Sequence, residues 1–248
     1  MLFLVLGMGK TGSLVAEVSR ERGHGVRAMD INENSRAAAL TAPTLAGVDA
    51  VIDFTTAEAA VENMRAVLAL GCRIVVGTTG WYAQLDAMKA IAERRSGSLL
   101  YGTNFSIGVQ KLFRLTAELA RLDGYAFSII ETHHTTKLDA PSGTAITLKE
   151  IIAAARPGDE VEVTSYRVGD AKGEHIVRAA SKYDVIELRH DAFSRRGFAL
   201  GAVRAAEWLA HQPPRRVGLP GSVRPAVDLR FILLALSPSG DGIHRVFV

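Results

Sequence analysis

Leu2-Phe-Leu-Val-Leu6, followed by Gly7-Met-Gly-Lys-Thr-Gly12, is the stretch that decides the fold of this chain. Five apolar residues in a row that stop at a glycine are typical of a strand buried on both faces of a parallel sheet. Residues 12–22 continue with a helical pattern. The sequence therefore predicts a strand, a tight glycine turn and a helix within its first 22 residues.

The glycine turn matches the pattern G-x-G-x-x-G of dinucleotide-binding proteins. Gly7 allows a tight turn, Gly9 lets the backbone approach a pyrophosphate, and Gly12 lets the helix pack closely on the strand. The helix N-terminus adds free N–H groups and a partial positive charge. We therefore predict that this turn binds a cofactor, through Gly7, Met8, Gly9, Lys10, Thr11 and Gly12.

Asp30 ends the next predicted strand, eighteen residues after Gly12. An acid at this spacing can accept hydrogen bonds from the hydroxyls of the adenosine ribose, and it repels a 2′-phosphate. The pattern favours NADH over NADPH, although Lys10 and Arg36 could offset the repulsion. The alternative is that Asp30 only caps a helix or forms a turn.

Strands and helices alternate up to about residue 105, which predicts βαβ units and a parallel, Rossmann-like sheet. Beyond this point the pattern is mixed and predicts an α+β domain with an open mixed sheet. We place the dinucleotide-binding domain at residues 1–105 and a second domain at 106–210. We expect residues 211–248 to pack back on the first domain. The predicted strands are 2–6, 26–30, 50–54, 73–76, 98–101, 127–134, 161–168 and 183–190, and the main helices are 12–22, 57–70, 81–94, 105–122, 144–155 and 197–210.

Two further turns follow predicted strands of the parallel sheet. In open α/β folds, ligands bind at the carboxyl ends of the strands. An ordinary turn is the alternative for each. The first turn contains Gly77, Thr78 and Thr79 and the second contains Thr103, Asn104, Phe105 and Ser106, and neither turn is decisive by itself.

The segment 131–145, E-T-H-H-T-T-K-L-D-A-P-S-G-T-A, carries the densest set of reactive side chains. Ser142, Gly143 and Thr144 are predicted to begin a helix, where N–H groups, a hydroxyl and the helix dipole favour a carboxylate. Lys137 can add a positive charge, and a histidine can donate a proton near neutral pH. Taken alone, Lys137 is more typical of a surface lysine and Pro-Ser-Gly-Thr of a plain helix start, and the alternative for the two histidines is one buried and one exposed strand residue. Only their co-occurrence favours a functional site. We expect no metal site, because no acidic or cysteine cluster supports one.

Composition excludes several other classes of protein. The net charge is only +3 and no run of basic residues occurs, so we expect no nucleic-acid binding. The first apolar run is too short for a signal peptide or a membrane span, and we expect no membrane association. Cys72 is the single cysteine, so a disulfide within the chain is impossible and a cytoplasmic location is expected.

Segment 131–145 resembles the signature of the dihydrodipicolinate reductases, E-x-H-H-x-x-K-x-D-A-P-S-G-T-A. Shorter matches are D-F-T at 53–55, G-T-T-G at 77–80, N-F-S-I-G-V at 104–109, G-E-H at 173–175 and S-R-R-G-F-A-L-G-A at 194–202. The resemblance covers about residues 2–229. It departs from the family in its glycine turn, which is one residue shorter, and in its tail after Leu229. A nucleotide-sensing Rossmann protein and another small-molecule dehydrogenase remain as alternatives.

The resemblance implies a homotetrameric enzyme that uses NADH or NADPH to reduce a cyclic imine in diaminopimelate and lysine biosynthesis. It implies that His133 is the general acid and that Lys137 is a second proton donor or a carboxylate anchor. It also implies that His134, Gly143 and Thr144 contact the substrate carboxylates; the helix-start argument adds Ser142. The resemblance further implies cofactor contacts on the nicotinamide side from Gly77, Thr78, Thr79 and segment 103–106, and a second domain, at 106–210, that binds the substrate and mediates oligomerisation. The substrate would be a small dicarboxylate, and closure of the two domains around it is expected.

Overall fold

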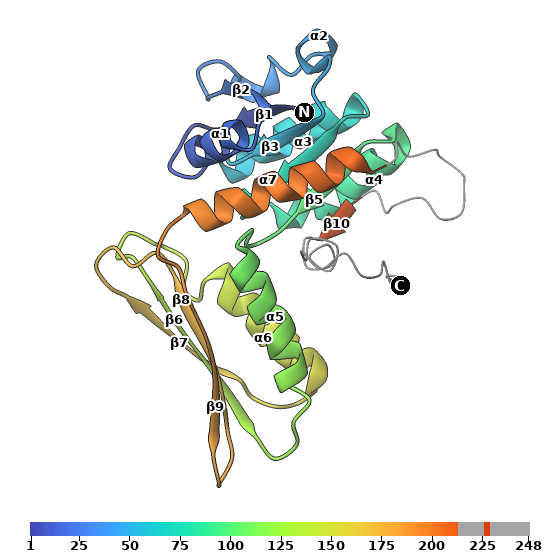
Figure 1. Cartoon of the computed structure of the whole chain (residues 1–248). Coiled ribbons are helices and arrows are strands. Elements are labelled where there is room, and N and C mark those ends of the chain that lie inside the picture. Colours follow the sequence, from blue (N-terminus) through green and yellow to red (C-terminus); the bar gives the residue numbers. More distant parts are fainter. Residues whose placement is uncertain (213–225, 229–248) are drawn as a thin grey trace. The chain divides into compact units, whose positions relative to one another are not determined.

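The computed structural model describes residues 1–212 and 226–228, which form two compact units (Figure 1). The first unit contains Met1–Phe105 and the described residues from Phe198 onwards, and the second contains Ser106–Gly197. No helix among these residues is long and apolar enough to cross a membrane.

The first unit is built on a six-stranded parallel sheet of order β10-β5-β4-β3-β1-β2. The order reverses beside β1, so the chain leaves the carboxyl ends of β1 and β3 towards opposite faces of the sheet, and this is where open α/β sheets bind ligands. The predicted Rossmann-like sheet is confirmed. Its strands are β1 (Leu2–Leu6), β2 (Gly25–Met29), β3 (Ala50–Asp53), β4 (Arg73–Val76), β5 (Ser98–Tyr101) and β10 (Ala226–Asp228).

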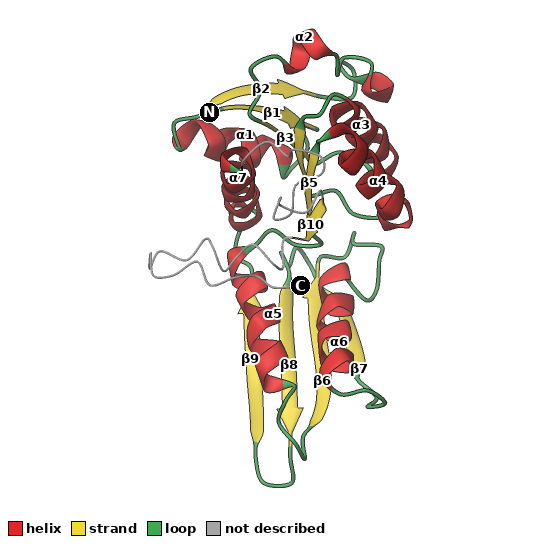
Figure 2. Ribbon diagram, turned by 90° about the vertical axis from the view of Figure 1, so that its right-hand side faces the viewer, coloured by secondary structure: helices red, strands yellow, loops and turns green. Residues whose placement is uncertain are grey.

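Helices cover both faces of this sheet, with α1 and α7 on one side and α3 and α4 on the other (Figure 2). Alternate residues of β1 point into the two hydrophobic cores, one on each face of the sheet. Phe3 and Val5 face α1 and α7, whereas Leu4 and Leu6 face α3. The bounds are α1 Gly12–Glu21, α2 Ala42–Leu45, α3 Ala57–Ala69, α4 Leu85–Arg95 and α7 Arg196–His211, with 3-10 turns at Ser35–Ala37 and Tyr82–Gln84.

Helix α7 differs from the prediction, which placed residues 197–210 in the second domain. From Phe198 onwards the helix belongs to the first unit, because its row of small and aliphatic side chains is buried against the sheet. A Cβ at Gly201 would lie 1.7 Å from the carbonyl oxygen of Phe105, so only glycine permits this close approach. Residues 226–228 pair with β5, while 213–225 and 229–248, including the tail after Leu229, lie outside the described residues.

The second unit is a four-stranded mixed sheet of order β7-β6-β8-β9, and α5 and α6 cover one of its faces (Figure 2). The predicted open mixed sheet is confirmed, but β8 was not predicted. Its inward positions are His175, Val177 and Ala179, and this polar and small set hides the alternation expected of a strand. The bounds are α5 Ile107–Leu119, β6 Ala126–His133, α6 Gly143–Ala155, β7 Glu162–Arg167, β8 Glu174–Ala180 and β9 Val185–Asp191.

Candidate active site

The glycine turn follows β1 and has the geometry of a phosphate-binding loop. Gly7 has φ +84°, and its N–H donates to the carbonyl of Met29 at 2.9 Å. A Cβ at Gly12 would lie 1.8 Å from the carbonyl oxygen of Gly7, so a side chain there is impossible without rebuilding the turn. A Cβ at Gly9 would meet nothing within 4 Å. The backbone at Gly9 is therefore open to a ligand, as a dinucleotide pyrophosphate requires.

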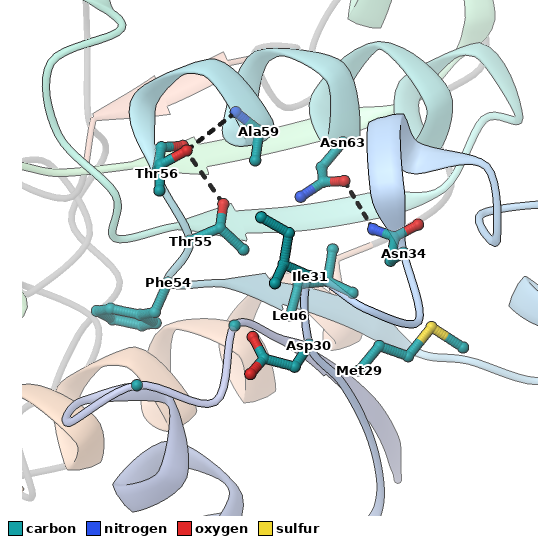
Figure 3. A pocket seen from close by; sticks show the side chains of 12 residues that line it. Leu6, Met29, Asp30, Ile31, Asn34, Phe54, Thr55, Thr56, Ala59 and Asn63 are labelled. Atoms are coloured by element: carbon teal, nitrogen blue, oxygen red, sulfur yellow. Dashed lines mark hydrogen bonds between the residues drawn. The ribbon is translucent and has the colours of Figure 1, made fainter.

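Two clefts meet at this turn. The first has a volume of about 270 Å³ and includes Asp30 and Ile31 (Figure 3). The second has a volume of about 500 Å³ and includes Lys10, Thr11 and the turn after β4. Because the clefts share part of their lining, one long ligand can occupy both. The shared residues are Gly9, Phe54, Thr55 and Thr56, and the second cleft is also lined by Gly77, Thr78 and Thr79.

Asp30 lies in the lining of the first cleft, one residue after β2. Its Oδ1 is 3.4 Å from the backbone N of Met8, which donates to it. The carbonyl of Asp30 accepts from the backbone N–H groups of Glu33 and Asn34, so the residue also shapes the turn. The side chain thus lines the first cleft, while the main chain forms part of the turn after β2.

The buried carboxylate of Asp53 binds three residues that line the clefts, Thr55, Asn63 and Thr78. Its Oδ1 accepts from the N–H and the hydroxyl of Thr55 at 3.0 and 2.8 Å and from the hydroxyl of Thr78 at 2.8 Å. Its Oδ2 accepts from Nδ2 of Asn63 at 2.7 Å. Burial raises the pKa of Asp53, and the hydrogen bonds from Asn63, Thr55 and Thr78 oppose this rise.

The hydrogen bonds of Asp53 continue through Asn63 to Asn34 in the lining of the first cleft, and Figure 3 shows the bond between the two asparagines. Oδ1 of Asn63 accepts from Nδ2 of Asn34 at 2.9 Å, and Oδ1 of Asn34 accepts from the backbone N–H of Ala39 at 3.2 Å. Asp53 was quoted only as part of the D-F-T match, with no role, and Asn63 and Asn34 were not predicted. Their spacing carries no signal, because the contacts join β3, α3 and the segment after β2.

The predicted cofactor residues 103–106 line neither cleft. Phe105 is buried, and its ring meets that of Phe54 edge-on at 6.1 Å between centroids. Ser106 begins the second unit, where its Oγ accepts from the N–H of Val109 and contacts Nε2 of His190, both at 3.4 Å. Thr103 and Asn104 lie in the loop after β5.

In the second unit, the end of β6 places His133 beside two other polar groups. Its Nδ1 hydrogen-bonds to Oε2 of Glu131, and its ring centroid lies 5.1 Å from that of His175. Burial lowers the pKa of His133, and the hydrogen bond that His133 donates to Glu131 partly offsets this. A proton on His133 is therefore weakly held, which suits a proton donor once a negative substrate raises its pKa.

Ser142 and His175 connect this group to the first turn of α6. Oγ of Ser142 accepts from the N–H of Ala145 at 3.2 Å and lies 3.2 Å from Nε2 of His175. Ser142 and Thr144 are both buried, so Ser142 acts here as the helix cap that the sequence predicts. Burial, followed by the charge on His133, lowers the pKa of His175 to about 3.

The other predicted residues lie on the loop after β6. Nζ of Lys137 is paired with both carboxylate oxygens of Asp139, at 2.7 and 2.8 Å. Nδ1 of His134 lies 2.7 Å from Oγ1 of Thr136. The structure thus brings His133, Lys137 and the start of α6 into the same unit, with His134 on the same loop.

Glu131, His133 and His175 are also close enough to hold a metal ion, with one ligand atom of each within 4.8 Å of the others. The sequence shows no acidic or cysteine cluster, but the fold places Glu131 beside His133 and His175 opposite Glu131 on β8. However, Glu131 already binds His133 and Arg167, and Lys137 acts electrostatically on His133. Because these cationic groups disfavour a further cation, we still expect no metal here.

His175 leads to a prediction for stability. Since its pKa is about 3 in the folded chain and near 6.5 when unfolded, the unfolded state binds the extra proton between these values. Stability should therefore fall as the pH drops from 6.5 towards 3. Between pH 7 and pH 5, the free energy of unfolding, measured with urea, is expected to fall less for His175→Gln than for the wild type. His211→Gln, an exposed histidine on α7, is the control, and equal slopes for His175→Gln and the wild type would contradict the prediction.

Comparison with known proteins matches both halves of the chain. Residues 3–105 match the family model described as "Dihydrodipicolinate reductase, N-terminus", and residues 108–220 match "Dihydrodipicolinate reductase, C-terminus". The 4-hydroxy-tetrahydrodipicolinate reductase of Natronomonas pharaonis is 39% identical, over 82% of this chain and 91% of the relative. That of Christiangramia forsetii is 35% identical, over 84% and 92%.

Among solved structures, the fold is similar to dipicolinate-bound dihydrodipicolinate reductase from Paenisporosarcina sp. TG-14. The TM-score is 0.69 at 22% identity, and the match covers 92% of this chain and 97% of that one. At this identity the similarity concerns the fold alone.

Proposed function

Because this chain belongs to the dihydrodipicolinate reductase family, we propose that it reduces 4-hydroxy-tetrahydrodipicolinate to tetrahydrodipicolinate with NAD(P)H, in diaminopimelate and lysine biosynthesis. The observation that carries the proposal is the match to both halves of the family, together with relatives at 35–39% identity that bear this name. The reaction consumes a hydride and a proton, releases water and leaves NAD(P)⁺.

The residues of the first unit fit a dinucleotide. The open backbone at Gly9 and the N-terminus of α1 are suited to the pyrophosphate, and Asp30 is suited to the adenosine ribose. Thr78 lines the second cleft, in the position proposed for the nicotinamide side. When bound, the reduced nicotinamide supplies the hydride.

The residues of the second unit fit a dicarboxylate that must receive a proton. The N–H groups at the start of α6, at Gly143 and Thr144, are proposed to bind one carboxylate, with His134 beside them. Lys137 is proposed to exchange Asp139 for a substrate carboxylate or to act as a second proton donor. His133 is proposed to protonate the ring carbon next to the one that receives the hydride.

A coupled assay tests the reaction. Pyruvate, aspartate semialdehyde and the upstream synthase are mixed with the protein, and the loss of NADH and of NADPH is followed in parallel. Oxidation that depends on the synthase is expected. If folded protein that binds NADH oxidises neither cofactor, the proposed substrate is wrong, although the fold assignment is unaffected.

We propose that NADH is the preferred cofactor, because the carboxylate of Asp30 repels a 2′-phosphate. Asp30→Ala is expected to raise the Kd of NADH about tenfold or more, since a hydrogen bond to a charged group is lost. The Kd of NADPH should change less or even fall. Fluorescence titration of both cofactors measures this, with Asp86→Ala, an exposed acid on α4, as the control. An equal rise in the Kd of both cofactors would show that Asp30 does not distinguish the ribose of NADH from that of NADPH.

The assembly and location follow from the family as proposals. We propose a cytoplasmic homotetramer without nucleic-acid or membrane partners. Light scattering coupled to size-exclusion chromatography measures the assembly, and a mass other than four times 26.6 kDa would contradict it.

A further inference from the structure

Glu131 is a buried acid that the proposed mechanism does not yet use. It lies on β6 two residues before His133, and residues two apart on a strand point to the same face. Its side chain is fully buried. One carboxylate oxygen, Oε2, binds Nδ1 of His133, and the other, Oε1, accepts from Nη2 of Arg167 at 2.8 Å.

Arg167 keeps this carboxylate ionised. Burial opposes the charge on Glu131, but hydrogen bonds from Arg167, Ser165 and His133 outweigh it and lower the pKa of Glu131 to about 2. Arg167 stands on β7 directly opposite His133 in the parallel register. A buried carboxylate held this way stays charged throughout the working range of pH.

The same guanidinium also holds the loop that carries Lys137. Nε of Arg167 donates to the carbonyl of Lys137 at 3.3 Å, and Nη2 donates to the carbonyl of Asp139 at 2.6 Å. One arginine therefore fixes both the carboxylate under His133 and the main chain at Lys137.

The other nitrogen of His133 is left open. Among the described residues no hydrogen bond to Nε2 occurs, and Gly173 lies beside it with φ +136°. A Cβ at position 173 would come within 3.1 Å of Nε2. Glycine at this position therefore keeps the approach to Nε2 clear.

We infer that Glu131 is a positioning residue. Its carboxylate accepts a hydrogen bond from Nδ1–H of His133 and so keeps a hydrogen on that nitrogen. The catalytic proton is therefore gained and lost at Nε2. The inference rests on the proposed function only for the statement that this proton is catalytic. An ionised acceptor on Nδ1 fixes the tautomer and the ring orientation, and it stabilises the imidazolium that must form before each turnover.

The remaining charges around His133 act in the opposite direction. Lys137 and Arg167 both disfavour a proton on the imidazole, and His175 lies against the ring on β8. Asp139 is nearer to Lys137 than to the histidine, and its own pKa is lowered: burial opposes its ionisation, but Lys137 outweighs burial. Glu131 is therefore the acid in direct contact with His133 that can favour its charged form.

The first test needs no variant of Glu131 and no activity. Nitrogen-15 NMR of protein labelled at histidine reports which ring nitrogen carries the hydrogen, and the spectrum of His133→Gln assigns the signal. Above its titration, neutral His133 is expected to be the Nδ1–H tautomer. A neutral His133 that carries its hydrogen on Nε2 would overturn the inference, whatever the substrate proves to be.

The second test is Glu131→Gln, assayed in full-length protein with Glu187→Gln on the exposed edge strand β9 as a matched control. The turnover number is expected to fall about tenfold to a hundredfold, while the Kd of NADH stays unchanged. Because activity needs protonated His133, the alkaline limb of the pH profile should move to lower pH, by about one unit. A kcat and a pH profile like those of the wild type would overturn the inference, and a wild type inactive in the coupled assay would instead refute the proposed reaction.

Discussion

Replacing His133 by glutamine is expected to lower kcat by about a hundredfold to ten-thousandfold, the range that loss of a general acid usually produces. Glutamine has a similar length and can accept or donate a hydrogen bond, but it cannot release a proton near neutral pH. When hydride reaches one ring carbon of the substrate in this variant, the neighbouring carbon must take its proton from water instead of from His133. The Kd of NADH should barely change, since His133 lies in the second unit and lines neither cleft of the first.

Steady-state kinetics in the coupled assay and a fluorescence titration with NADH measure the two quantities. The neighbouring His134→Gln is the informative comparison, because a residue that only binds a carboxylate should raise KM more than it lowers kcat. His211→Gln, on the exposed end of α7, should leave both constants unchanged. A large loss of NADH affinity in His133→Gln would contradict its role as the acid.

The sequence predicts the first unit well because its signals are local. A buried strand, a turn that requires glycine at 7 and 12, and an acid at the end of the next strand are all constraints between near neighbours. The turn at Gly12 is an example, since a Cβ would collide with the carbonyl of Gly7 only five residues earlier. Such constraints can be read without knowing how the rest of the chain folds.

What the sequence misses depends on strand register and on packing between distant segments. His175 reaches Ser142 and His133 because β8 pairs with β6, and β8 itself was not predicted. Arg167 meets Glu131 across 36 residues of chain, through the pairing of β6 with β7. Helix α7 shows the same limit, because its alanine-rich face is compatible with either unit and only the packed sheet decides between them.

The residue Asp53 illustrates this limit and gives the second large expected effect. Asp53→Asn is expected to destabilise the protein by about 2–4 kcal/mol, by leaving buried donors without acceptors. It should also weaken the binding of NADH and of NADPH to the same extent, because the lost match with Asn63 displaces residue 53 and, with it, Thr55 and Thr78 in the cleft lining. This equal loss distinguishes Asp53 from Asp30, whose replacement is expected to affect NADH more.

The reason that asparagine fails lies in the direction of the hydrogen bonds. The backbone N–H of Ala39 can only donate, which fixes Oδ1 of Asn34 as its acceptor and Nδ2 of Asn34 as the donor to Asn63. Asn63 must then present its own Nδ2 to residue 53. An asparagine at 53 that accepts from Thr55 and Thr78 through its oxygen offers only an amide nitrogen to Asn63, so two donors face each other.

Exchanging the two side chains should restore the pattern. In the double variant Asp53→Asn with Asn63→Asp, the new carboxylate at 63 accepts from Asn34 and from the amide nitrogen at 53, while the amide oxygen at 53 still accepts from Thr55 and Thr78. Urea unfolding and titration with NADH should show the double variant closer to the wild type than Asp53→Asn is, a coupling of about 1–3 kcal/mol between adjacent sites. Asn63→Asp alone should be destabilised as well, because it sets two carboxylates against each other in a buried site. If the losses of stability and of NADH affinity in the double variant equal the sum of those in the two single variants, the direction of these hydrogen bonds does not fix the cleft lining. Asp53 would then act through its charge alone.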